Sequence, residues 1–247
     1  MNLHAAWYVA TVSSMKPETP TARRIVLDVP GWPGNAAGQH VDIRLTAENG
    51  YQASRSYSLA SSGDASSIEL AVDRVPSGEV SPFLVDELMV GDQFEVRGPL
   101  GGWFVWRPGE QSGRPVQLIA GGSGIVPLAS MVRAHRAASD ASTFRLLYAV
   151  RTPDDVFFCD ELAREQTDTG TGRVRVDYVF SRRAPAEAKR PAGRLTRAIL
   201  AELVVPPEMN PLVYICGSTP FVEQVLDWLK GLGHDVDDVR AERFGGA

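Results

Sequence analysis

Cysteine, histidine and excess basic charge are all scarce in this sequence, and each shortage argues against a class of protein. The two cysteines, Cys159 and Cys216, form no CxxC pair, which argues against a zinc site, an iron–sulfur cluster or a disulfide scaffold and favours a reducing cytoplasm. The four histidines lie far apart, so we expect no metal site. With 25 Lys and Arg against 30 Asp and Glu, the net charge is −5 and the basic residues are scattered, which argues against nucleic-acid binding.

Long apolar runs are also missing. No stretch approaches the length of a membrane span, and no basic region precedes the apolar residues near the N-terminus, so we expect neither a transmembrane helix nor a signal peptide. The 247 residues predict about two domains, and a hydrophobic fraction of 44% supplies a core for each. We therefore expect a soluble, cytoplasmic, monomeric protein without a nucleic-acid or membrane partner.

The first half has the pattern of an antiparallel barrel. Apolar and polar residues alternate strictly over residues 39–45, so one face of that strand is buried and the other is wet. Several such short segments, separated by Gly and Pro turns, predict a small antiparallel β-barrel over residues 1–108. The other predicted strands are 7–12, 25–29, 68–72 and 94–96.

In the second half, strands alternate with helices. Residues 108–115 are rich in turn formers and are the predicted linker to a second domain, residues 109–247. Repeated strand–helix units imply a parallel sheet with helices on both faces, and ligands bind where its strands end. The predicted strands are 116–120, 144–150, 173–180 and 212–216, and the predicted helices are 127–138, 156–165, 195–203 and 221–232. The predicted fold is thus an α+β two-domain protein, with an antiparallel β-barrel followed by an α/β nucleotide-binding domain.

Two segments of the barrel half have ligand-binding chemistry. Arg55-Ser56-Tyr57-Ser58 places a cation, a flat ring and hydroxyls on one extended segment, and these groups suit a diphosphate, an aromatic ring system and polar ring edges. In Gly78-Glu79-Val80-Ser81-Pro82, Ser81 is the predicted N-cap of a short helix reaching Leu88, whose free N–H groups suit a phosphate. Taken alone, the first is an ordinary barrel strand and the second a helix cap.

Three segments of the second half follow predicted strands. The turn Gly121-Gly122-Ser123-Gly124 allows the backbone to approach a diphosphate at a helix start, although it is not the GxGxxG fingerprint. Cys216-Gly217 ends a strand, where a single cysteine is most often a small hydrophobe. Ser181-Arg182-Arg183 follows another strand, and two arginines in a loop are by themselves solvated charge.

The order of these segments resembles the ferredoxin–NADP reductase superfamily. Arg55-x-Tyr57-Ser58 is similar to its flavin-binding signature, Gly78-x-x-Ser81 to its GxxS element, and Cys216-Gly217 to its nicotinamide-side turn. Residues 121–127 are similar to its GGTGIAP-type segment, with Ser123 in place of Thr. Residues 98–104 resemble its GPxGxF turn, and a tight hairpin explains them equally well.

The resemblance implies FAD and NADPH as cofactors, with NADH possible, and it assigns roles to residues. Tyr57 would stack on the flavin, Arg55 would bind its diphosphate, and Ser58 would hydrogen-bond at flavin N5. The implied flavin-binding residues are Arg55, Ser56, Tyr57, Ser58, Val72, Gly78, Val80 and Ser81, and the implied catalytic residues are Ser58, Cys216 and Glu242. The implied NADPH-binding residues are Gly122, Ser123, Gly124, Arg151, Ser181 and Arg182.

The tail admits two interpretations. Residues 240–244 read as a frayed end, the usual default. They also resemble the family's terminal Ala-Glu-x-aromatic segment, in which Glu242 would reach the active site and Phe244 would cover the free face of the flavin.

The function that the resemblance implies is an FAD-dependent NAD(P)H oxidoreductase. It would pass a hydride from NADPH to the flavin and electrons on to a protein acceptor, such as a ferredoxin or an oxygenase iron–sulfur component. Three alternatives stay open: a dedicated oxygenase reductase whose iron–sulfur domain is a separate protein, an electron-transfer subunit of a larger complex, and a non-enzymatic nucleotide-binding or regulatory module. The subunit of the dihydroorotate dehydrogenase type carries a cysteine cluster that this sequence lacks.

Overall fold

The computed structural model describes residues 6–110, 113–167 and 174–245. The chain divides into two compact units, Met1–Trp106 and Arg107–Ala247, close to the expected boundary after residue 108. Residues 111 and 112 of the predicted linker, residue 173 of a predicted strand and the end of the tail lie outside the described residues.

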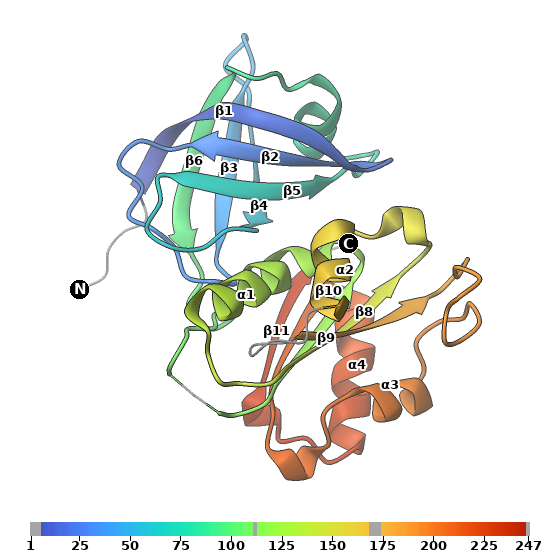
Figure 1. The fold of residues 1–247 in the computed structure, drawn as a ribbon. Coiled ribbons are helices and arrows are strands. Elements are labelled where there is room, and N and C mark those ends of the chain that lie inside the picture. The colour runs from blue at the N-terminus through green and yellow to red at the C-terminus, as the bar shows by residue number, and fades with distance from the viewer. Residues whose placement is uncertain (1–5, 111–112, 168–173, 246–247) are drawn as a thin grey trace. The chain divides into compact units, whose positions relative to one another are not determined.

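The first unit is a six-stranded antiparallel sheet in the order β4-β3-β6-β1-β2-β5 (Figure 1). Its strands are β1 (Ala6–Thr19), β2 (Ala22–Asp28), β3 (His40–Thr46), β4 (Gln52–Ser58), β5 (Ser67–Asp73) and β6 (Gln93–Leu100). A bridge between Leu59 and Leu70 joins the chain after β4 to β5, the opposite edge of the sheet, and so closes the barrel. The predicted antiparallel barrel is confirmed.

Alternate residues of these strands fill the barrel. Ile25 and Leu27 of β2 and Val41 and Ile43 of β3 are fully buried, whereas Asp42 between them points outward. This is the two-residue period that the sequence showed, and it fixes which face each neighbouring residue occupies.

The helix predicted after β5, with Ser81 as its N-cap and Leu88 within it, differs from the observed structure. A five-residue π-helical turn, η1 (Phe83–Glu87), stands there and ends before Leu88. Ser81 is not its N-cap: the Ser81 hydroxyl accepts a hydrogen bond from the Val75 N–H at 3.1 Å instead. The Ser81 hydroxyl therefore closes the loop between β5 and η1 and does not cap a helix.

The second unit is a parallel five-stranded sheet in the order β11-β10-β7-β8-β9. Its strands are β7 (Val116–Gly121), β8 (Phe144–Val150), β9 (Val174–Phe180), β10 (Leu212–Ser218) and β11 (Val239–Phe244). The chain builds outward from β7 to β9 and then returns to place β10 on the other side of β7. The topological switch point, where ligands bind in open α/β sheets, is therefore between β7 and β10.

Helices cover both faces of this sheet, as predicted (Figure 1). The helices are α1 (Ile125–Ala138), α2 (Cys159–Thr167), α3 (Arg197–Leu203) and α4 (Thr219–Gly231). Helices α3 and α4 pack on the face formed by Ile119, Leu147 and Ile215. The alternate residues Leu118 and Tyr214 are buried on the opposite face, which α1 covers.

The tail is a strand and not a frayed end. β11 pairs in parallel with β10, and the register sets Glu242 beside Cys216 and Phe244 beside Ser218. Among the residues that the structure describes, no helix combines the length and the apolar character needed to cross a membrane.

Candidate functional site

Strand β4 presents Arg55 and Tyr57 on one face, as the two-residue period of a strand requires. Tyr57 packs against the barrel core and is half-buried, while Arg55 is exposed and close enough for its charge to act on the Tyr57 hydroxyl. Ser56 points to the other face, where its hydroxyl donates to Asp42 Oδ1 at 2.6 Å. Any contact of Ser56 with a cofactor therefore falls to its main chain, and its role stays a prediction.

The Arg55 guanidinium lies at the surface of the barrel. Its Nη1 donates to the Ser54 carbonyl at 2.7 Å, and its Nη2 is 3.3 Å from Glu79 Oε2. The other Glu79 oxygen accepts from the Tyr51 hydroxyl at 2.7 Å. A guanidinium that is 56% exposed can receive phosphate oxygens from solvent, so the cation fits a diphosphate. Periodicity gave no signal for Tyr51 or Glu79, because the residues meet only in the folded barrel.

Ser81 and Tyr57 meet through their hydroxyls, and this pairing joins the two predicted motifs. Burial raises the pKa of Tyr57 to about 12, while the Arg55 charge and the side-chain hydrogen bond with Ser81 act in the opposite direction. The phenol is therefore neutral at physiological pH. A Cβ on Gly78 would lie 3.1 Å from Ser81 Oγ, so a glycine lets this loop close.

Val72 and Val80, both predicted to bind the cofactor, have fully buried side chains in the barrel core. Their predicted roles, like that of the half-buried Ser58 at the end of β4, stay predictions.

Two turns pack against each other at the switch point of the second unit. The β7 strand runs into a 3₁₀ turn, η2 (Gly122–Gly124), which leads directly into α1. A Cβ on Gly124 would lie 2.1 Å from the Cys216 carbonyl oxygen, and one on Gly121 would lie 2.6 Å from the Phe221 ring. Gly217 is pressed against the same ring, at 2.8 Å from a built Cβ.

Gly121, Gly124 and Gly217 therefore allow β7, β10 and α4 to pack closely, and the diphosphate-binding role of the turn stays a prediction. The sequence did not reveal the packing role of Phe221, which lies in the first turn of α4. The available signal was a glycine at the end of each of two predicted strands, because such glycines leave room for a bulky ring. Gly122 differs, because its φ is +56° and open space lies where a Cβ would be. Helix α1 starts beside it with no acidic residue in its first turn, so its free N–H groups and dipole fit an anion such as a diphosphate.

Cys216 and Glu242, two of the implied catalytic residues, lie side by side on β10 and β11, and their catalytic roles stay predictions. Burial raises the pKa of the Cys216 thiol well above its usual range, and the neighbouring Glu242 charge raises it further, whereas the Gly217 N–H opposes the shift. The thiol is fully buried and neutral, so it acts as a small apolar group and not as a nucleophile. Ser58, the third predicted catalytic residue, belongs to the other unit.

The two cysteines are expected to react differently with a thiol reagent. Cys159 is exposed at the start of α2, whereas Cys216 is buried. In native protein at pH 8, Ellman's reagent is expected to label one thiol within minutes, and the second only after unfolding, because a neutral buried thiol is a poor nucleophile. A Cys159→Ser variant should then show no rapid labelling. Rapid labelling of both thiols in the native protein would contradict the buried position of Cys216.

Arg151, Ser181 and Arg182 come together at the ends of β8 and β9. The Ser181 N–H donates to the Val150 carbonyl at 2.8 Å, and the Arg182 N–H to the Arg151 carbonyl at 2.9 Å. Both arginine side chains are exposed, and neither forms an ion pair with a residue that the structure describes. Arg183, by contrast, pairs with Asp154.

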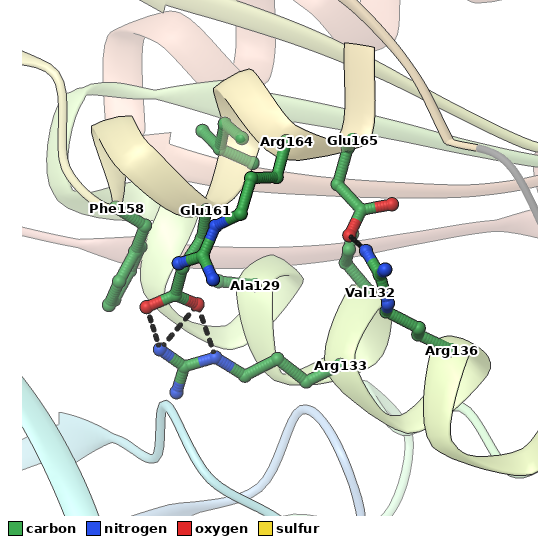
Figure 2. Close-up of a pocket in the computed structure, with 9 residues that line it drawn as sticks. Ala129, Val132, Arg133, Arg136, Phe158, Glu161, Arg164 and Glu165 are labelled. Atoms are coloured by element: carbon green, nitrogen blue, oxygen red, sulfur yellow. Dashed lines mark hydrogen bonds and ion pairs between the residues drawn. The ribbon is translucent and has the colours of Figure 1, made fainter. Parts of the chain in front are cut away.

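A cavity of about 360 Å³ lies between α1 and α2, and none of the predicted site residues lines it (Figure 2). Two of its three lining arginines are paired with its two glutamates: Arg133 with Glu161 at 2.8 Å and Arg136 with Glu165 at 2.5 Å. Because carboxylates already neutralise these two cations, the cavity suits a phosphate poorly. Within the described ranges, no group of three or more His, Cys, Asp or Glu could hold a metal ion.

Comparison with known proteins assigns each half of the chain to a family. Residues 15–105 match the oxidoreductase FAD-binding domain, and residues 118–227 match the oxidoreductase NAD-binding domain. The chain is 32% identical, over 84% of its length, to 55% of the glycine betaine monooxygenase reductase subunit of Chromohalobacter salexigens. It is 37% identical, over 65% of its length, to 44% of methane monooxygenase component C of Methylosinus trichosporium. The chain thus spans about half the length of these two relatives.

A solved structure shares the two-domain fold of this chain. The cytochrome P450 reductase GcoB of Amycolatopsis superposes with a TM-score of 0.82 and 28% identity, covering 98% of this chain and 71% of that one.

Proposed function

We propose that this chain, which belongs to the ferredoxin–NADP reductase superfamily of FAD- and NAD-binding oxidoreductases, takes electrons from NADPH and passes them through FAD to a protein acceptor. The observation that best supports this function is the switch point of the parallel sheet, where the open Gly122 turn, the start of α1 and the Cys216–Glu242 pair converge. The acceptor we propose is an oxygenase component, because one relative is the reductase subunit of a monooxygenase and another is a component of a monooxygenase.

When bound, FAD would supply the redox chemistry that amino-acid side chains lack. In the barrel unit, Arg55 would bind the cofactor diphosphate, the neutral Tyr57 would pack its ring on the flavin, and Ser58 would hydrogen-bond at N5. In the other unit, Gly122, Ser123 and Gly124 would hold the NADPH diphosphate at the start of α1. Cys216 and Glu242 would orient the nicotinamide, the thiol by packing and the carboxylate by polar contact, and Phe244 would cover the flavin.

Anaerobic titration of the FAD-loaded protein with NADPH tests this function. The flavin absorbance near 450 nm is expected to bleach, and adding an oxidised ferredoxin or oxygenase iron–sulfur component should restore it. Bleaching by NADPH without reoxidation by any protein acceptor would contradict the acceptor class. Nucleotide binding without bleaching would favour a non-enzymatic nucleotide-binding module.

Arg182 is expected to set the preference for NADPH. Its exposed side chain has no carboxylate partner among the described residues, so its guanidinium is available to the 2′-phosphate. Arg182→Ala should raise the KM for NADPH by about 10- to 100-fold, which corresponds to losing a hydrogen bond to a charged group of roughly 1.5–3 kcal/mol. The KM for NADH should stay within a factor of two.

Arg183 supplies the matched control, because it lies in the same loop but pairs with Asp154. Arg183→Ala is expected to change both KM values little. Equal losses for NADPH and NADH in Arg182→Ala would show that Arg182 does not contact the 2′-phosphate.

A further inference from the structure

Three side chains of the barrel form a hydrogen-bonded chain over its surface: Tyr51, Glu79 and Arg55. The Tyr51 hydroxyl donates to Glu79 Oε1 at 2.7 Å, and Glu79 Oε2 lies 3.3 Å from Arg55 Nη2. The three residues come from different places, since Tyr51 immediately precedes β4, Arg55 lies within β4, and Glu79 lies in the loop between β5 and η1.

Tyr51 is a fixed anchor for this chain. Its N–H donates to Asn49 Oδ1 at 3.0 Å and its carbonyl accepts from the Ala47 N–H at 2.8 Å, so the turn holds its main chain. The hydrogen bond to Glu79 raises the pKa of Tyr51, which keeps the phenol a donor. Tyr51 is 57% exposed, so burial does not explain the position of its side chain, whereas the hydrogen bond to the Glu79 carboxylate does.

The chain has an electrostatic consequence for any anion that binds Arg55. Glu79 neutralises the guanidinium, so the local formal charge is zero where a diphosphate would bring negative charge. A diphosphate must either draw Arg55 away from Glu79 or bind beside a carboxylate, and both weaken binding. Because the Arg55 and Glu79 side chains are 56% and 51% exposed, solvent screens the effect and keeps it small.

We propose that Glu79, held in place by Tyr51, competes with the FAD diphosphate for Arg55 and so lowers the flavin affinity of this protein. The proposal rests on the proposed function, in which Arg55 binds that diphosphate. It makes Glu79 a residue that tunes how readily flavin exchanges.

The test is the affinity of the flavin-free protein for FAD, measured by quenching of flavin fluorescence at low salt. Glu79→Gln removes the charge but keeps an oxygen that accepts from Tyr51. It should bind FAD about two- to five-fold more tightly than the wild type, the size expected for one exposed ion pair. Tyr51→Phe releases the carboxylate from its anchor and should tighten FAD binding in the same direction.

Two controls isolate the diphosphate. Riboflavin, which has no phosphate, should bind the wild type and Glu79→Gln equally well. Glu95→Gln makes the same change in net charge at the Arg44 pair on the outer barrel face and should leave FAD affinity unchanged. In 0.5 M salt, the difference between Glu79→Gln and the wild type should shrink, because the Debye length falls well below about 10 Å.

The outcomes separate this proposal from the function on which it rests. If the wild type binds FAD and Glu79→Gln binds it equally or less tightly, Glu79 does not compete for Arg55. If Tyr51→Phe weakens FAD binding, Tyr51 does not act by holding Glu79. A wild-type protein that takes up no flavin would instead overturn the proposed function itself.

Discussion

Gly124→Ala is expected to slow reduction by NADPH by roughly 100-fold and to destabilise the second unit. The added Cβ would lie 2.1 Å from the Cys216 carbonyl oxygen and 2.8 Å from the Gly217 nitrogen. Both neighbours are backbone atoms of β10 and its turn, so no side-chain rotation relieves the overlap, and the β7 and β10 ends must separate. Overpacking of this kind costs about 3 kcal/mol, which for a unit of this size lowers Tm by roughly 10 °C.

The catalytic loss should be larger than the loss of stability. The same separation displaces the start of α1 and the Cys216–Glu242 pair, and a misplacement of about 1 Å can slow a reaction by roughly 100-fold. Stopped-flow reduction by NADPH and thermal unfolding measure the two effects. Gly193→Ala is the matched control, since a Cβ there meets nothing within 4 Å and its backbone suits any residue. A Gly124→Ala protein with native Tm and native reduction rate would show that the two turns are not in contact.

Gly122→Ala distinguishes packing from ligand approach at the same turn. Its Cβ would enter open space, so the cost is that of a left-handed backbone, roughly 1 kcal/mol. Gly122→Ala should therefore be nearly as stable as the wild type, and its weaker NADPH binding would come from the Cβ standing where the nucleotide lies.

The barrel and the parallel sheet could be predicted because their signals are local. Alternation at Val41, Asp42 and Ile43 assigns one face to the core, and the burial of Val41 and Ile43 follows it. Strand-then-helix units in the second half likewise fix a parallel sheet. These patterns depend only on residues that are close in sequence, so no knowledge of tertiary contacts is needed.

Local sequence patterns did not predict the structure of residues 239–244, which form β11. Arg240, Glu242 and Arg243 make β11 look like a polar tail, since an edge strand needs little apolar character. Its partner β10 decides its structure, through a register that the sequence cannot show. The resemblance named Glu242 for a functional role, and the pairing places it next to Cys216.

In the candidate site, too, some features follow from the local sequence and others depend on tertiary contacts. Arg55 and Tyr57 could be placed on one face of a strand from their spacing alone. The use of Ser81 as an acceptor for the Val75 N–H, and the Tyr51–Glu79 hydrogen bond, depend on how separate loops pack. Long-range contacts of this kind are invisible to periodicity, so they are where the structure adds most to the sequence.

Arg55→Ala is expected to strip FAD from the protein while leaving the barrel folded. The side chain is 56% exposed and contributes no core packing, so unfolding by heat should change little. Loss of a charge-assisted contact of roughly 1.5–3 kcal/mol raises the FAD dissociation constant by about 10- to 100-fold. The rise in the FAD dissociation constant should be about 100-fold. Arg55→Ala leaves the Glu79 carboxylate without its cation, so an unpaired negative charge stands near the diphosphate.

Flavin content after gel filtration and titration of the flavin-free protein with FAD measure this loss. Arg55→Lys keeps the charge but not the planar fork, so it should fall between the wild type and Arg55→Ala. Arg44→Ala removes an equal charge from the outer barrel face, where Arg44 pairs with Glu95 and lies 3.9 Å from the Trp7 ring, and should retain its flavin. If Arg55→Ala keeps a full complement of FAD, the diphosphate is held elsewhere on the barrel, because no other feature of β4 offers it a cation.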